Sequence, residues 1–182
     1  MTARLLVVVS GLPASGKTTV GTVLSERLSL ALIDKDAILE ALFDSLGCAD
    51  RNERQRLSRA SDEVLFGLAA AADTAVLVNW WNHDSAPSRL QAAGAVVVEV
   101  FCDCPVEVAA TRFEARIRHP GHHDFRRSPE QLAEDIEHMR KWYRGPLGLN
   151  ENPVHIDTSR PLDADRVTRR VLAAIEALGS SV

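Results

Sequence analysis

The chain has 182 residues, of which 46% are hydrophobic and 25% charged, with a formal net charge of −4 at pH 7. This length and composition predict one globular domain, and the slightly acidic balance makes nucleic acid an unfavoured partner. No apolar run approaches the roughly 20 residues of a membrane span, no signal-peptide pattern begins the chain, and the odd cysteine count favours a reducing cytoplasm.

A phosphate-binding loop follows the first predicted element. Residues 3–10 (ARLLVVVS) form the continuous apolar run of a buried parallel strand, and residues 19–30 have a helical pattern. Between them the sequence fills the G-x-x-x-x-G-K-[ST] template at every fixed position, from Gly11 to Thr18. The alternative is a glycine-rich turn that binds nothing, but such a turn gives the lysine no structural purpose. The motif therefore predicts a nucleotide site.

Each part of this loop has a predicted role. Its glycines allow successive backbone N–H groups to point into one concavity, and the next helix adds free amides and its positive dipole end. Lys17 is expected to reach the β- and γ-phosphates of ATP, and the Thr18 hydroxyl to ligate Mg²⁺. The predicted nucleotide-binding residues of the loop are Gly11, Pro13, Ala14, Ser15, Gly16, Lys17, Thr18 and Thr19.

Strands and helices alternate along the rest of the chain. Further strands are predicted at 31–36, 75–80, 95–103 and 153–158, and helices at 37–44, 53–73, 85–94, 105–118, 128–143 and 163–179. This alternation predicts an α/β fold with a five-stranded parallel sheet, in which ligands bind outside the carboxyl ends of the strands.

Three features occur together in this order: the phosphate loop, the D-x-D of Asp34 and Asp36 after the second strand, and a late arginine-rich segment. The set resembles the small P-loop kinases, which include shikimate and gluconate kinases, chloramphenicol phosphotransferase, zeta toxins and polynucleotide 5′-hydroxyl kinases. The resemblance covers nearly the whole chain and implies a single three-layer α/β/α domain over residues 1–182, with a lid at about 116–128. Only the phosphate loop is a highly specific motif, so the resemblance does not identify the phosphoryl acceptor.

Two carboxylates follow the second predicted strand. Asp34 and Asp36 would point to the same side if strand geometry persists through both residues. By resemblance, Asp36 is the base that takes the proton of the acceptor hydroxyl, and Asp34 orients Mg²⁺. The alternative for Asp36 is an N-cap of the following helix. Lys35 is expected to face away as a solvated residue.

Two tryptophans lie in the stretch that ends the third predicted strand. Flat apolar walls with a few polar groups suit an acceptor pocket, whereas the alternative is one core tryptophan and one that packs under the lid. Many relatives carry an acid where this chain has Asn79, so Asp34 is the carboxylate left to ligate the metal. The predicted acceptor-binding residues of this stretch are Asn79, Trp80, Trp81, Asn82 and His83.

Arginines cluster between residues 112 and 127. A planar guanidinium suits phosphate, and a mobile lid that delivers it also excludes water. Arg116 and Arg118 are therefore predicted to be catalytic lid residues, and Arg112, by resemblance, to stack on adenine as part of the nucleotide site. The alternative is a solvated basic face paired with nearby glutamates.

Histidines are interleaved with these arginines. His119 and His122 are predicted to contact the acceptor or to pack within the lid. Together with His123 and Asp124 they imitate a metal cluster, but their spacing matches no standard zinc site.

These features predict an ATP- and Mg²⁺-dependent phosphotransferase that acts on a hydroxyl of a small molecule. The alternatives are a polynucleotide 5′-hydroxyl kinase, a zeta-type toxin, which normally has an antitoxin partner, and a nucleotide-binding regulatory switch that transfers nothing. The guanine-reading motif N-K-x-D is absent, which argues against a regulatory switch of the GTPase kind. Its absence also predicts a preference for ATP over GTP.

Overall fold

The computed structural model describes residues 4–122 and 128–179. Its strands form one parallel sheet in the order β2-β3-β1-β4-β5. The predicted α/β class with five parallel strands is therefore confirmed. The strands are β1 (Leu5–Gly11), β2 (Ala31–Asp34), β3 (Thr74–Val78), β4 (Val96–Asp103) and β5 (Val154–Asp157).

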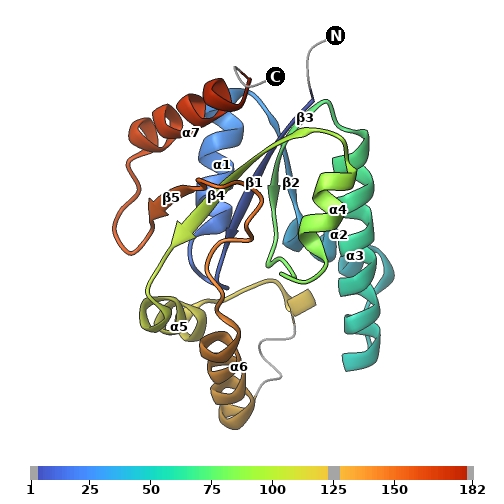
Figure 1. The fold of residues 1–182 in the computed structure, drawn as a ribbon. Coiled ribbons are helices and arrows are strands. Elements are labelled where there is room, and N and C mark those ends of the chain that lie inside the picture. Colours follow the sequence, from blue (N-terminus) through green and yellow to red (C-terminus); the bar gives the residue numbers. More distant parts are fainter. Residues whose placement is uncertain (1–3, 123–127, 180–182) are drawn as a thin grey trace.

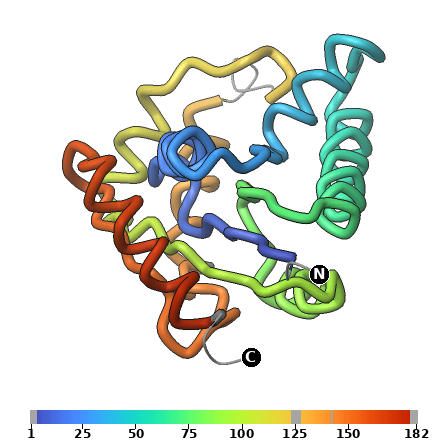
Figure 2. The backbone as a smooth tube through the Cα atoms, turned by 90° about the horizontal axis from the view of Figure 1, so that it is seen from above, coloured from blue at the N-terminus to red at the C-terminus, as the bar shows by residue number. Residues whose placement is uncertain are grey.

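Helices cover both faces of the sheet (Figures 1 and 2), which confirms the three layers. One face packs against α1 (Lys17–Leu28) and α7 (Ala164–Gly179), and the other against α3 (Arg51–Ala71) and α4 (Ala86–Ala92). The alternation of a strand explains this division: along β1, Val7 and Val9 join the first core, whereas Leu6 and Val8 join the second. The remaining helices are α2 (Lys35–Leu46), α5 (Val106–Ala115), the 3₁₀ turn η1 (Pro120–His122) and α6 (Pro129–Trp142).

The helices α5 and α6 lie beyond the carboxyl ends of the central strands (Figure 1). They share a third apolar cluster, in which Phe113 of α5 and Met139 of α6 pack with Leu12 of the phosphate loop. This packing places α6 as a wall on the side of the sheet where ligands of such folds bind. In the described parts of the chain, no helix combines the length and the hydropathy needed to cross a bilayer.

The turn from β2 to α2 differs from its prediction. The strand ends at Asp34, two residues early, because the Asp34 carboxylate accepts a hydrogen bond of 2.9 Å from the backbone N–H of Asp36 and caps α2. Asp36 therefore belongs to the first turn of the helix, and the capping role considered for it belongs to Asp34. Such a cap contributes about 1 kcal/mol.

Two of the helix limits that differ bear on the site. The helix predicted from residue 19 begins at Lys17, because Gly16 takes a positive φ of 93° and starts the helix within the motif. The helix predicted to reach residue 118 ends at Ala115, and Arg116 has extended angles. Arg118 therefore lies outside the helix, and the chain after α5 crosses to α2 (Figure 2).

A buried carboxylate fixes the start of the phosphate loop. Glu99 in the middle of β4 has no exposed surface, and it accepts hydrogen bonds from the Ser10 hydroxyl (2.7 Å) and from the backbone N–H groups of Leu147 (2.6 Å) and Leu149 (3.1 Å). Ser10 directly precedes the loop, and residues 147–149 follow α6. Glu99 thus links the loop and the segment that anchors α6 through one satisfied network.

Candidate active site

The phosphate loop has the backbone of an anion cradle. Positive φ angles occur at Gly11 (138°), Ala14 (59°) and Gly16 (93°). A Cβ at Gly11 would come within 2.9 Å of the Cys102 carbonyl oxygen, so this position requires glycine. The Ser15 hydroxyl is buried and has no hydrogen-bond partner among the described residues. A buried polar group without a partner is costly, and an incoming phosphate oxygen would supply one.

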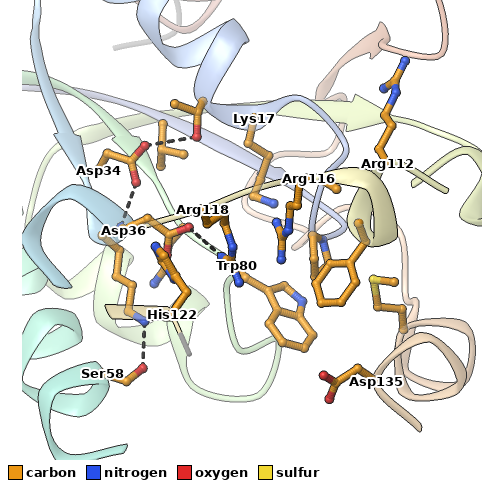
Figure 3. A pocket seen from close by; sticks show the side chains of 18 of the residues that line it. Lys17, Asp34, Asp36, Ser58, Trp80, Arg112, Arg116, Arg118, His122 and Asp135 are labelled. Carbon is orange, nitrogen blue, oxygen red and sulfur yellow. Dashed lines mark hydrogen bonds and ion pairs between the residues drawn. The ribbon is translucent and has the colours of Figure 1, made fainter. Parts of the chain in front are cut away.

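Lys17 is the buried cation of this loop (Figure 3). Its Nζ donates a hydrogen bond of 2.6 Å to the Leu12 carbonyl, and the residue is only 9% exposed. Burial lowers the pKa of Lys17 to about 8, and the nearby acids Asp36 and Asp34 offset only part of that effect. Because no described carboxylate forms an ion pair with this ammonium, an anionic ligand suits the site.

A hydroxyl and a carboxylate meet beside Lys17. The Thr18 hydroxyl donates a hydrogen bond of 3.1 Å to Asp34. Burial, and then the negative charge of Asp36, raise the pKa of Asp34, while its hydrogen bonds and Lys17 oppose this shift. Oxygen donors of these two kinds are the ligands that Mg²⁺ prefers, and a divalent cation would also offset the buried negative charge. The residues present therefore fit both the phosphates and the metal.

Asp36 lies in the first turn of α2 and faces Arg118 (Figure 3). The Arg118 Nη1 atom is 3.5 Å from the Asp36 Oδ2 atom, and the Asp36 side chain stays 48% exposed. Both residues line the same cavity as Lys17. The structure thus brings the predicted base, one predicted lid arginine and the phosphate loop to one place.

A single cavity of about 1180 Å³ runs from the phosphate loop to α3 and α6. Its nucleotide end contains six of the eight predicted loop residues, since Gly11 and Ser15 do not line it. Its far end is polar, with side chains from α2, α3, the end of β3 and α6. The lining residues of the loop are Pro13, Ala14, Gly16, Lys17, Thr18 and Thr19, and those of the far end include Lys35, Asp36, Arg51, Arg54, Gln55, Ser58, Asp62, Asn79, Trp80, Gln131, Glu134, Asp135 and His138.

The other two predicted arginines also line the cavity. Arg112 donates hydrogen bonds to the backbone carbonyls of Thr158 (2.8 Å) and Ser159 (3.3 Å), so it holds the loop after β5 beside the phosphate loop. The Arg116 guanidinium lies over the Phe113 ring, 4.0 Å from its centroid. Arg116 points toward Trp80 across the cavity (Figure 3).

The two tryptophans after β3 lie in different environments. Trp80 is 53% exposed, lines the cavity and makes an edge contact with His138 of α6. Trp81 is 4% exposed, and its indole donates a hydrogen bond to the Val9 carbonyl within the core. Trp81 is therefore the core tryptophan of the second alternative, whereas Trp80 lines the cavity as the first alternative expects.

Asn82 and His83 do not reach the cavity either. The Asn82 side chain accepts hydrogen bonds from the backbone N–H groups of Asp84 (2.9 Å) and Ser85 (3.0 Å) and shapes the turn into α4. The His83 ring contacts the Gly145 carbonyl at 3.1 Å. Of the predicted acceptor residues in this stretch, only Asn79 and Trp80 line the described cavity, because the chain turns sharply after Trp80.

The two described histidines of residues 116–122, the segment that crosses from α5 to α2, both contact α2. His122 is buried, lines the cavity and lies 2.9 Å from Glu40, whereas His119 lies 3.1 Å from Asp44 and outside the cavity. Within residues 4–122 and 128–179 no three metal-ligating side chains gather, and His123 and Asp124 lie outside the described residues. The part of the predicted lid at 123–127 lies outside them too.

One lining residue contradicts its prediction. Lys35 was expected to face solvent, yet it is buried and its Nζ donates a hydrogen bond of 2.8 Å to Ser58 of α3. The prediction assumed strand alternation at this position, but Lys35 is already the first residue of α2. The local pattern pointed instead to Asp36, which directly precedes the apolar run, as the N-cap.

Comparison with known proteins gives a consistent picture. The cytidylate kinase of Sulfurisphaera tokodaii is 26% identical, over 92% of this chain and 95% of its own. A solved structure from Chloroflexus aurantiacus, to which a kinase activity is ascribed, is 29% identical and superposes with a TM-score of 0.80 over 94% of this chain and 98% of its own. Shikimate kinase from Acinetobacter baumannii shares the fold, with 20% identity and a TM-score of 0.60 over 97% and 94% of the two chains. The family described as AAA domain (AAA_33) matches residues 6–146, and because this match spans most of the chain, the protein belongs to this family of P-loop kinases.

Proposed function

We propose that the protein is an ATP-dependent phosphotransferase that moves the γ-phosphoryl group of ATP to a hydroxyl of a small acceptor. The observation that carries the proposal is the position of Asp36. Its partly exposed carboxylate lies in the same cavity as Lys17, on the side that continues toward Trp80 and α6. An acceptor in that part of the cavity could place its hydroxyl between Asp36 and the end of the nucleotide.

The proposed reaction is an in-line displacement. The acceptor oxygen forms a bond to the γ-phosphorus, the bond from that phosphorus to the bridging oxygen breaks, and ADP leaves with that oxygen. The hydroxyl proton passes to the Asp36 carboxylate. Lys17 and Arg118 would stabilise the negative charge on the transferred group, which is the main protein contribution in phosphoryl transfer.

Magnesium fits beside this path. Thr18 and Asp34 would hold the ion next to the β- and γ-phosphates, with Asp34 acting directly or through a water molecule. When bound, Mg²⁺ neutralises phosphate charge and orients the oxygens. Arg112 and the segment of Thr158 would border the base of the nucleotide, since both lie at the cavity end next to Gly16.

The test is ADP production from ATP and Mg²⁺ across a panel of acceptors. The panel should contain sugars, sugar acids, nucleosides, aminoglycosides and a DNA 5′-hydroxyl end. Cytidine 5′-monophosphate is added because one relative is a cytidylate kinase, and turnover of this compound alone would indicate a phosphate acceptor and contradict the proposed hydroxyl acceptor. Lys17→Ala is the blank, since it removes the phosphate-loop cation. We expect acceptor-dependent ADP formation by the wild type only. A rate of ADP formation that is the same with and without every acceptor would instead support a nucleotide switch.

A further inference from the structure

The far end of the cavity contains a buried cation that the proposed transfer does not use. Lys35 of α2 is 9% exposed and lines the cavity, and its ammonium points to Ser58 of α3. An ammonium group has three N–H donors, and the hydrogen bond found for this one goes to the neutral Ser58 hydroxyl at 2.8 Å. None of the described carboxylates lies within ion-pair distance of Lys35.

The charged groups around Lys35 do not neutralise it. Asp36 and Asp62 attract the ammonium, but Asp36 faces Arg118, and Asp62 accepts a hydrogen bond of 2.9 Å from the Asn79 amide. Arg54 and Arg118 repel it. Burial, with these two guanidinium groups, holds the pKa of Lys35 below its usual range, although the two acids oppose the shift. A buried ammonium with a neutral partner is costly, and an anion beside it would relieve that cost.

We propose that Lys35, oriented by Ser58 and supported by Arg54, binds an anionic oxygen group of the acceptor, a carboxylate or a phosphate ester. The acceptors are then hydroxylated acids or phosphate esters, and neutral polyols are excluded. This inference rests on the proposed function for the ligand's role as phosphoryl acceptor. Two consecutive residues at the start of α2 recognise two parts of one molecule: Lys35 binds the anion and Asp36 the hydroxyl.

The first experiment measures binding without any catalysis. Inorganic phosphate and acetate are titrated by calorimetry into the protein whose phosphate loop is filled with Mg²⁺ and a non-hydrolysable ATP analogue. At least one anion should bind the wild type, and Lys35→Met should weaken that binding about tenfold or more, the loss that one charge-assisted hydrogen bond implies. Lys141→Met, an exposed lysine of α6, is the matched control and should bind like the wild type.

Ser58→Ala provides a second variant in case Lys35→Met unfolds, and it should weaken binding in the same direction by a smaller factor. Thermal unfolding and affinity for the ATP analogue check that each variant is folded. If neither anion binds the wild type, or if both folded variants bind like the wild type, Lys35 is not an anion ligand and the inference is wrong.

The second experiment compares three acceptors of one skeleton: sorbitol, gluconate and sorbitol 6-phosphate. ADP formation with an acidic member and not with sorbitol supports the inference, and the preferred acid decides between carboxylate and phosphate. Equal turnover of sorbitol overturns it while leaving the kinase proposal intact. If no compound in this set or in the acceptor panel is phosphorylated but anion binding still depends on Lys35, the anion site stands and the proposed transfer loses its support.

Discussion

The guanidinium of Arg118 lies against the carboxylate of Asp36, with 3.5 Å between Nη1 and Oδ2 (Figure 3). The two residues are distant in sequence, and the contact exists because the segment after α5 crosses to the first turn of α2. It joins the proposed base to a cation that the proposed transfer also needs. In this arrangement the ion pair with Asp36 keeps Arg118 at the cavity, where it would contact the γ-phosphate when ATP binds.

The same segment contacts α2 at two further places. Glu40 and Asp44 follow Asp36 at intervals of four residues, so all three acids lie on one helical face. His122 contacts Glu40 and His119 contacts Asp44, and Gly121 packs against Phe43 between them. These contacts attach residues 118–122 to α2 and so fix the position of Arg118 beside Asp36.

Replacement of Arg118 tests its part in transfer. Arg118→Gln removes the charge near the transferred group, so kcat should fall by about 10²-fold or more while the affinity for ATP changes less. Steady-state kinetics on the true acceptor provide the measurement. Arg140→Gln, which breaks an exposed pair with Glu107, is the control and should keep wild-type kinetics. Equal kcat values for the two variants would remove Arg118 from the mechanism.

The pKa of Lys17 predicts how ATP affinity depends on pH. Burial lowers this pKa to about 8, and bound phosphates would raise it again because they favour the ammonium. Affinity for ATP should therefore be constant from pH 7 to about 8 and fall as the pH rises further, where the free protein has lost the proton. Phosphate groups with a pKa near 6 contribute little in this range.

Calorimetry in buffers from pH 7 to 9.5 measures this dependence. Lys17→Met should bind ATP weakly, with no change over the same range. Its fold should survive, because a lysine whose folded pKa lies below its unfolded value destabilises the fold while it is protonated, which at pH 7 it is. Its melting temperature at pH 7 should therefore equal or exceed that of the wild type. A variant that retains the wild-type pH profile would show that another group controls it.

Glu99 should matter for stability rather than chemistry. In Glu99→Gln one carboxylate oxygen becomes an NH₂ group that faces donors of the same kind, so the fold should lose about 1–3 kcal/mol. For a chain of this size, each kcal/mol lowers the melting temperature by roughly 2–4 °C. Thermal unfolding followed by circular dichroism measures the change. Glu26→Gln, at an exposed position of α1, should leave the melting temperature unchanged, and an equally stable Glu99→Gln would contradict the network described above.

Local patterns made the nucleotide side of the site predictable. The phosphate loop is a contiguous motif whose chemistry depends on neighbouring backbone groups, so Lys17 and Thr18 could be placed from sequence. The alternation of strands and helices likewise fixed the parallel sheet and its layers. These features depend on periodicities of 2 and about 3.6 residues, which a sequence displays directly.

The acceptor side depends on contacts that no local pattern contains. Trp81 was expected at the site, but the turn after Trp80 buries its indole against Val9. Lys35 was expected in solvent, and its partner Ser58 comes from the next helix. Glu99 gave no signal at all, since its donors come from two segments that are far from it in sequence. Side chains such as these are placed by tertiary packing, which overrides local pattern.

The two acids after β2 separate the proposed base from the proposed metal ligand. Because Asp34 caps α2, Asp36→Asn should leave the cap, the melting temperature and ATP binding intact. An asparagine cannot take the hydroxyl proton, so turnover should fall by about 10²–10⁴-fold. Saturating Mg²⁺ should not restore it. The measurements are kcat on the true acceptor, thermal unfolding and calorimetric titration with ATP.

Asp34→Asn should behave in the opposite way. The asparagine side-chain oxygen can still accept the hydrogen bond from the Asp36 backbone and cap the helix. The folded pKa of Asp34 is raised, so the charge of this carboxylate destabilises the fold at pH 7. Removal of the charge should therefore not lower the melting temperature. The loss of negative charge beside Thr18 should instead raise the Mg²⁺ concentration needed for half-maximal turnover, and excess Mg²⁺ should restore part of the rate. If Asp34→Asn shows the wild-type Mg²⁺ dependence, the metal is held elsewhere. If Asp36→Asn keeps wild-type turnover, Asp36 is not the base, and the Asp34 cap leaves it no other role in starting the helix.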